Sequence, residues 1–268
     1  MSGILGHRGL LLSAYDPDAQ ALFDRLQDPS AELKEKINTL ILELKDEGIW
    51  DLLDTLYVPA RIDDIPGALC DWKRTTKVAI PQGTTTYSEL YGFESAGGAG
   101  DYIDTDYVPS VDGVNFTLNN ASAGCYIITA ATAATADYFG ANTTTNNIIR
   151  LNRFSSGTNH YATVNGPTGA SAFDTASLNV AGKLVSCSRS GSGSNTSTYL
   201  YVDGVATGTA DTADANSLVA ATIYIMARNN NGSDINNADA KIAMWYAGAA
   251  LTTQQLVAFN TAIEAYLA

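Results

Sequence analysis

The sequence predicts a mainly β protein, an antiparallel sandwich that follows an N-terminal helical region and is closed by a C-terminal helix. From about residue 59, short runs rich in Tyr, Thr, Val and Ile alternate with clusters of Gly, Asn, Asp and Ser. Strands at this spacing, without intervening helices, are typical of sandwiches. Before this region apolar residues recur at helical spacing, and after it the chain carries explicit helix-capping signals.

Residues 1–58 are expected to form an arm and a helical region for attachment or oligomerisation, and residues 59–268 the sandwich with its closing helix. Asp16 and Pro17 indicate the start of a first helix, and Ser30 caps a second one that runs to about Glu47. The arm is expected to pack against a neighbouring subunit. The apolar stripe of the second helix fits either a core or a partner. For contact with a partner we select Leu33, Ile37, Leu40, Ile41, Leu44 and Trp50.

Several later segments carry local signals for strands, a hairpin and a helix. Asp203 and Gly204 supply the two positive-φ residues of a type I′ hairpin turn. Thr252, with Gln255 three residues later, predicts a capping box at the start of the final helix. The clearest predicted strands are 124–132, 148–154, 160–165, 183–189, 198–208 and 241–246.

Composition excludes several partners. A formal net charge of −13 argues against a nucleic-acid footprint and against binding to an anionic membrane surface. No apolar run approaches the roughly 20 residues that span a bilayer. The three cysteines, Cys70, Cys125 and Cys187, are odd in number and widely spaced, so we expect buried thiols in a protein assembled in a reducing cytoplasm.

Two groups of motifs carry a family resemblance. The first is Tyr91-Gly92-Phe93 with the glycine-rich turn and extended phrase of residues 97–109. The second comprises, in order, residues 186–189, 199–205, 225–232 and 242–248 and the final helix. This order resembles the concanavalin A-like (laminin-G-like) jelly-roll domain of phage virion structural proteins, and residues 37–58 resemble the leader of such proteins.

The resemblance implies a jelly-roll sandwich in a capsid decoration, spike or fibre protein. Such a protein is assembled in the host cytoplasm, exposed on the particle surface and bound to other capsid or tail proteins. The N-terminal apolar stripe is large for the short segment that carries it, so a homo-oligomer, such as a trimer, is expected. The alternative is a carbohydrate-binding module or adhesin outside the virion shell, because fold alone does not fix function.

Enzymatic activity is not expected. Glycoside hydrolases share this fold, and they need two suitably placed carboxylates. Between residues 48 and 263 the chain has only two glutamates, Glu89 and Glu94, and their odd spacing puts them on opposite faces of a strand. Asp104 and Asp106 share a face, but no glutamate joins them. A hydrolase is therefore the least favoured function.

Weak adhesion to a host-surface glycan stays open, since repeated copies gain avidity. Sugar binding generally uses exposed aromatic rings together with polar side chains that hydrogen-bond to the sugar hydroxyls. Tyr138 and Phe139, expected in a loop, are the aromatic candidates, and Asp104 and Asp106 are the polar ones.

No cofactor is required by the sequence, although calcium stays open. Calcium takes six to eight oxygen ligands, and the Asn-rich stretch near residue 230 offers several. The candidate ligands are Asn229, Asn231, Asp234 and Asp239. The same residues also suit Asx-turns in a loop.

Overall fold

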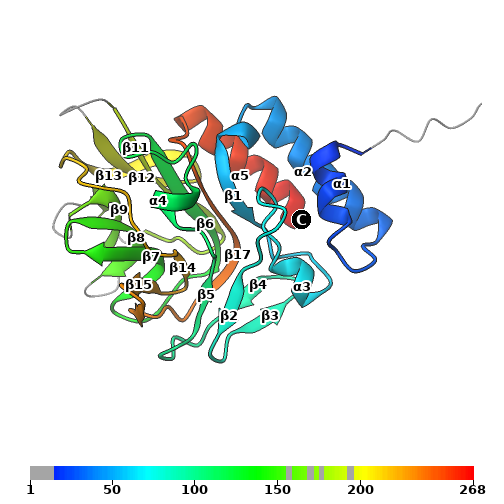
Figure 1. The fold of residues 1–268 in the computed structure, drawn as a ribbon, viewed down its shortest axis with the longest axis horizontal. Coiled ribbons are helices and arrows are strands. Elements are labelled where there is room, and N and C mark those ends of the chain that lie inside the picture. Colours follow the sequence, from blue (N-terminus) through cyan, green and yellow to red (C-terminus); the bar gives the residue numbers. More distant parts are fainter. Residues whose placement is uncertain (1–14, 155–158, 168–171, 175–177, 192–195) are drawn as a thin grey trace, which may run out of the picture.

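The chain folds into two packed β-sheets with a helical layer on one side (Figure 1). The computed structural model describes residues 15–154, 159–167, 172–174, 178–191 and 196–268. The arm expected at residues 1–14 therefore lies outside the described residues. The fold class predicted from the sequence, a mainly antiparallel sandwich with a C-terminal helix, is confirmed.

The first sheet, here called the back sheet, is built around its long strand β17. One edge of β17 pairs with β6, which continues through β11 and β12 to β13. The other edge pairs with β4 near its start and β1 near its end, and β3 extends from β4. The strands are β1 (Leu53–Tyr57), β3 (Thr86–Ser88), β4 (Gly92–Glu94), β6 (Ala121–Thr129), β11 (Lys183–Ser190), β12 (Ser197–Val202), β13 (Val205–Asp211) and β17 (Lys241–Gly248).

The second sheet, here called the front sheet, runs in the order β2, β5, β14, β7, β8, β9 and β10, and β10 also touches β13 of the back sheet. The short hairpin β15–β16 joins it through a parallel pairing with β7. The strands are β2 (Ile80–Gln82), β5 (Tyr102–Asp104), β7 (Ala136–Thr144), β8 (Asn147–Phe154), β9 (Asn159–Gly166), β10 (Ala172–Asp174), β14 (Tyr224–Ile225), β15 (Arg228–Asn230) and β16 (Ser233–Ile235).

The two sheets meet around Trp245, which is fully buried. Its ring lies 6.3 Å from Phe139 of the front sheet and 6.3 Å from Tyr57 of β1, measured between centroids. The next residue, Tyr246, points the other way and packs 4.9 Å from Phe259 of the C-terminal helix. Both faces of the back sheet are thus covered at β17, which explains why this strand is buried almost along its whole length.

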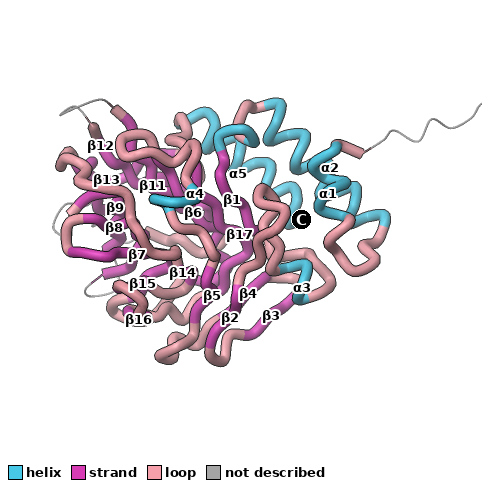
Figure 2. Tube along the Cα trace, viewed as in Figure 1, coloured by secondary structure: helices cyan, strands magenta, loops and turns pink. Residues whose placement is uncertain are grey.

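The helices α1, α2 and α5 gather on the far side of the back sheet (Figure 2). α5 has the capping box predicted from Thr252 and Gln255, and the predicted hairpin turn has φ of 51° at Asp203 and 79° at Gly204. The helical elements are α1 (Pro17–Phe23), α2 (Ala31–Asp46), the 3-10 turn η1 (Trp50–Leu52), α3 (Ile65–Ala68), α4 (Pro109–Asp112) and α5 (Thr253–Leu267).

The apolar stripe of α2 contacts this chain itself and is not free for a partner. α2 packs on α5, and both belong to one hydrophobic core with the sandwich. The boundary expected at residue 58 falls one residue after β1, a strand of the back sheet. The selection of attachment residues is therefore wrong, because every one of them is at most 6% exposed: Leu33, Ile37, Leu40, Ile41, Leu44 and Trp50.

Candidate functional site

The outer face of the front sheet, which points away from the back sheet, is the candidate site. Its orientation follows from Phe139, which contacts Trp245 in the core. Because successive strand residues face opposite sides, the next residue, Gly140, faces outward. Gly140 pairs with Tyr224 on one side and with Arg150 on the other. These two side chains therefore lie on the outer face, on either side of a glycine.

Two tyrosines stack on this face. Ile103 of β5 is buried in the core, so its neighbours Tyr102 and Asp104 point outward. The rings of Tyr102 and Tyr224 lie 4.0 Å apart between centroids, with 17° between their planes. Asp104 pairs with Tyr224 and accepts a hydrogen bond from the Thr222 hydroxyl at 3.3 Å. Burial raises the pKa of Asp104 above its ordinary value.

Two arginines lie beside the tyrosines. A Cβ placed on Gly140 would come 3.1 Å from Cβ of Arg150 and 3.1 Å from Cγ of Arg228, so the absence of a side chain lets the Arg228 stem lie over β7. Arg228 Nε is 3.6 Å from the Oδ2 atom of Asp137, which is fully buried. Burial raises the pKa of Asp137, and Arg228 and Arg150 oppose that rise.

These side chains make a surface suited to a polar ligand. They combine aromatic rings, guanidinium donors and carboxylate and hydroxyl acceptors on rigid strands, as ligand sites generally do. Tyr161 of β9 lies on the same face, because it pairs with Asn152, two residues after Arg150 on β8. The front-face cluster is defined here as Tyr102, Asp104, Arg150, Tyr161, Tyr224 and Arg228, all of them half-buried except Tyr224, which is 6% exposed.

The aromatic residues predicted to bind sugar are not in this cluster. Tyr138 and Phe139 were expected in an exposed loop, but they lie within β7 and are fully buried. A buried ring cannot stack on a glycan, so these two predictions are wrong. The Ala-rich segment before them hid the strand, since small residues carry little of the β-branched and aromatic signal by which strands are recognised.

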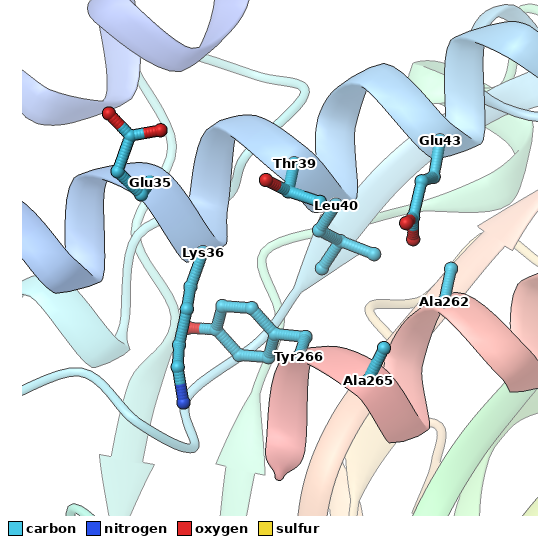
Figure 3. A pocket seen from close by; sticks show the side chains of 8 residues that line it. All are labelled: Glu35, Lys36, Thr39, Leu40, Glu43, Ala262, Ala265 and Tyr266. Carbon is cyan, nitrogen blue, oxygen red and sulfur yellow. The ribbon is translucent and has the colours of Figure 1, made fainter.

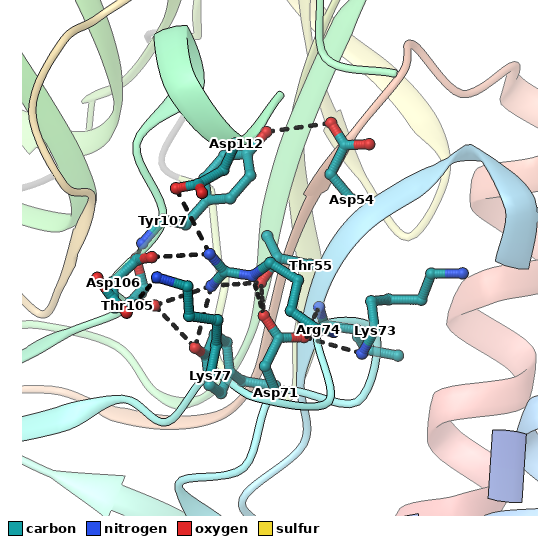
Figure 4. Close-up of polar contacts among 12 residues, drawn as sticks. Asp54, Thr55, Asp71, Lys73, Arg74, Lys77, Thr105, Asp106, Tyr107 and Asp112 are labelled. Carbon is teal, nitrogen blue, oxygen red and sulfur yellow. Dashed lines mark hydrogen bonds and ion pairs between the residues drawn. The ribbon is translucent and has the colours of Figure 1, made fainter. Parts of the chain in front are cut away.

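Asp104 belongs to the front-face cluster, whereas Asp106 belongs to a structural network around Arg74 (Figure 4). Asp106 adopts a positive φ of 49°, and its carboxylate pairs with Lys77 at 2.8 Å. The Arg74 guanidinium donates to the carboxylate of Asp71 and to the carbonyl oxygens of Thr105 and Asp106. This network ties the loop after α3 to the end of β5, and it leaves the Asp106 carboxylate engaged with Lys77.

Three of the four residues proposed for calcium already accept hydrogen bonds within the protein through their side chains, and the fourth, Asn231, lies in a turn. Asn229 accepts from the Gly232 N–H at 2.7 Å, an Asx-turn, and Asp234 accepts from the Gly100 N–H at 2.8 Å. Asn231 is an exposed turn residue with φ of 51°, and Asp239 accepts from the Thr132 N–H at 2.9 Å. Over the described ranges, no three His, Cys, Asp or Glu side chains are grouped as a metal site would require.

Replacing Asp239 with alanine should destabilise the fold by about 0.5–1.5 kcal/mol, because the N–H groups of Thr132 and Ala133 lose a half-buried carboxylate that accepts their hydrogen bonds. Partial burial would raise the pKa of Asp239, but hydrogen bonds from Thr132 and Ala133 outweigh it and lower the pKa. Because the pKa of Asp239 is lower in the folded protein, its carboxylate contributes this stabilisation at pH values above the unfolded-state pKa, near 3.8. The stabilisation is lost as the pH falls through the folded-state pKa.

Urea unfolding of the wild type and of Asp239→Ala at pH 7 and at pH 3 checks this prediction. The difference should shrink at the lower pH and should be the same in calcium chloride as in EDTA. A calcium-dependent rise in wild-type stability that Asp239→Ala abolishes would instead restore the metal site.

The two glutamates considered as hydrolytic residues, Glu89 and Glu94, do not form a catalytic pair. Glu94 pairs with Lys241 at 3.1 Å on the back sheet, and Glu89 is exposed in the turn between β3 and β4. Of the six residues in the front-face cluster, sequence reasoning selected only Asp104. Two of the others, Arg150 and Arg228, are among the few basic residues after Lys77. Because basic residues are rare in this part of the acidic chain, they were the available signal for the strands that carry the cluster.

In the part of the chain described here, no helix is long and apolar enough to cross a membrane.

Comparisons with known proteins identify the fold and no family. No family model matches the chain, and no curated protein is similar to it. Domain 4 of AbnA, a GH43 extracellular arabinanase from Geobacillus stearothermophilus solved with arabinotriose, matches at 16% identity and a TM-score of 0.53, over 78% of this chain and 98% of that one. Trypanosoma rangeli sialidase matches at 11% identity and a TM-score of 0.52, over 85% of this chain. The match spans 39% of that sialidase, and the two likenesses together show a β-sandwich fold.

Proposed function

We propose that the protein is a non-catalytic carbohydrate-binding protein that takes a glycan on the outer face of its front sheet. The observation that carries this proposal is the stacked pair Tyr102–Tyr224 beside Arg150 and Arg228, on the face of the sandwich opposite the helical layer. A pyranose or furanose ring has an apolar face for an aromatic ring and hydroxyls for guanidinium and carboxylate groups.

The placement of the carboxylates supports binding without hydrolysis. Asp104 is half-buried and hydrogen-bonded to Thr222, and Asp137 is fully buried beneath Arg228. A glycosidase needs an acid and a second carboxylate that both reach the scissile bond. Among the described residues of the cluster, only Asp104 has a carboxylate that a glycan can touch.

The fold comparison adds support of a general kind. This chain matches 98% of domain 4 of the arabinanase, and that domain was solved in complex with arabinotriose. Since the identity is 16%, the likeness carries over the fold and leaves the ligand of this chain to be identified. Arabino-oligosaccharides are therefore a rational first probe.

Binding should be measured by a glycan array followed by calorimetric titration of the glycans that bind. Tyr102→Ala and Arg228→Ala should each weaken binding about tenfold, which corresponds to roughly 1.4 kcal/mol. Tyr199→Ala is the matched control, because Tyr199 is a 38% exposed tyrosine on β12 of the back sheet. Its affinity should equal that of the wild type.

Thermal unfolding of each variant separates lost contacts from lost structure. If no glycan binds, or if Tyr102→Ala and Tyr199→Ala bind equally well, the front face is not a sugar site. The virion location implied by the sequence resemblance stays a prediction, and mass spectrometry of purified particles is its test. The buried α2 stripe no longer supplies an attachment surface for it.

A further inference from the structure

Arg228 holds its guanidinium group on the outer face of the front sheet, and among the described residues none accepts a hydrogen bond from it. Its side chain is only 11% exposed, and its Nε atom lies 3.6 Å from Oδ2 of Asp137, beyond hydrogen-bond distance. A guanidinium has five N–H donors, and leaving them without acceptors in a mostly buried place costs free energy. A ligand group that accepts from Arg228 would offset this cost.

Arg150 brings a second positive charge to the same place. Gly140 lies between the two arginines, since a Cβ placed on it would be 3.1 Å from Cβ of Arg150 and 3.1 Å from Cγ of Arg228. Burial lowers the pKa of Arg150, the Asp137 carboxylate opposes this fall, and the charge of Arg228 adds to it. Asp137 is fully buried and already accepts from the Asn236 amide at 2.8 Å. Two guanidinium groups thus share one buried carboxylate.

The other carboxylate of the front-face cluster lies at its far end. Strand pairing places Asp104, Tyr224, Gly140 and Arg150 in that order across four neighbouring strands. Three strand spacings separate Asp104 from Arg150, which is about 14 Å. Asp104 also accepts from the Asp106 N–H at 3.0 Å. An acidic group bound beside the arginines is therefore remote from Asp104.

The hollow between α2 and α5 has the opposite charge (Figure 3). It lies in the helical layer, where Glu35 and Glu43 line it together with a single cation, Lys36. Carboxylates at this hollow repel an acidic ligand. Because the whole chain has a formal net charge of −13, such a ligand needs a local group of cations, and the front sheet provides one.

We propose, on the basis of the proposed function, that the glycan bound by the front sheet carries a carboxylate, as uronic acids do. Arg228 and Arg150 bind this carboxylate, and the sugar rings extend over Tyr102 and Tyr224 toward Asp104. A carboxylate accepts two parallel hydrogen bonds from one guanidinium, and its negative charge balances the second arginine. A neutral hydroxyl does neither.

Methyl esterification of the ligand tests the proposal on the unaltered protein. An array of neutral and uronate-containing glycans, oligogalacturonates among them, supplies the probes. Calorimetric titration then compares each uronate that binds with its methyl ester. The ester keeps the sugar ring but loses the charge, so it should bind about tenfold more weakly. The difference should shrink at high salt, because ions screen the attraction.

Two charge variants locate the carboxylate. Arg228→Gln should weaken binding of the acid about tenfold and hardly affect the ester, so that most of the preference for the acid disappears. Lys183→Gln is the matched control, because it removes one positive charge from a 39% exposed side chain of the back sheet. It should leave the preference intact. Thermal unfolding shows whether each variant is folded.

Different results contradict the ligand class and the sugar site. Equal binding of acid and ester overturns the carboxylate proposal, as does binding of neutral glycans alone, while the sugar site survives if Tyr102→Ala abolishes that binding. A preference for the acid that Arg228→Gln leaves unchanged also overturns it. If no glycan of either kind binds, the proposed function itself is wrong.

Discussion

Replacing Arg74 with methionine should lower the free energy of unfolding by about 3–5 kcal/mol, the largest effect expected from a single charge in this protein. Asp71, its partner, is completely buried and also accepts from the Thr55 hydroxyl at 2.7 Å. Without the guanidinium, that carboxylate stays in a poorly solvated site without its counter-charge. The carbonyl oxygens of Thr105 and Asp106 lose their donors as well.

Lys77→Met is the matched control for Arg74→Met, because Lys77 follows Arg74 by three residues and pairs with Asp106 in a more exposed place. Their side chains are 36% and 44% exposed, so the pair is screened by solvent and contributes at most about 1 kcal/mol. Urea unfolding followed by tryptophan fluorescence compares the two. Equal effects from both substitutions would show that burial does not decide the strength of this network.

Leu40→Ala should destabilise the protein by about 2–5 kcal/mol and should lower the stability of the sandwich together with the helices. Leu40 is 1% exposed and lies where α2 packs on α5. Because one hydrophobic core spans the helices and both sheets, we expect a single unfolding transition.

Leu42→Ala, on the same helix, removes the same atoms from a side chain that is 42% exposed and should change stability by about 0.5 kcal/mol or less. Circular dichroism at a helical and at a β-sheet wavelength gives the measurement. Two separate transitions, with only the helical one shifted by Leu40→Ala, would show that residues 15–58 fold as an independent unit.

Local signals predicted local structure well. The capping box at Thr252, the turn at Asp203 and the helix after Ser30 each depend on residues within a few positions of one another, and each is present. Such features are governed by backbone hydrogen bonds that neighbouring side chains satisfy. The sandwich class follows from the spacing of the strands, which is also visible in the chain.

The candidate site was harder to predict because it depends on pairings between distant strands. Tyr102 and Tyr224 are 122 residues apart in the sequence and meet only because β5 pairs with β14. The stripe of α2 has the same pattern whether it contacts α5 or another subunit, so the sequence alone leaves its partner open. Tyr138 shows the converse error, since an aromatic residue between small residues resembles a loop until its strand partners are known.

The pairing of β1 with β17 has a consequence for synthesis of the protein. β1 ends at Tyr57 and its partner strand spans Lys241–Gly248, while α2 needs α5 to cover its apolar stripe. On the ribosome, β1 and α2 therefore cannot complete their packing until β17 and α5 have emerged. Such long-range pairing slows folding and leaves apolar surface open to chaperones in the meantime.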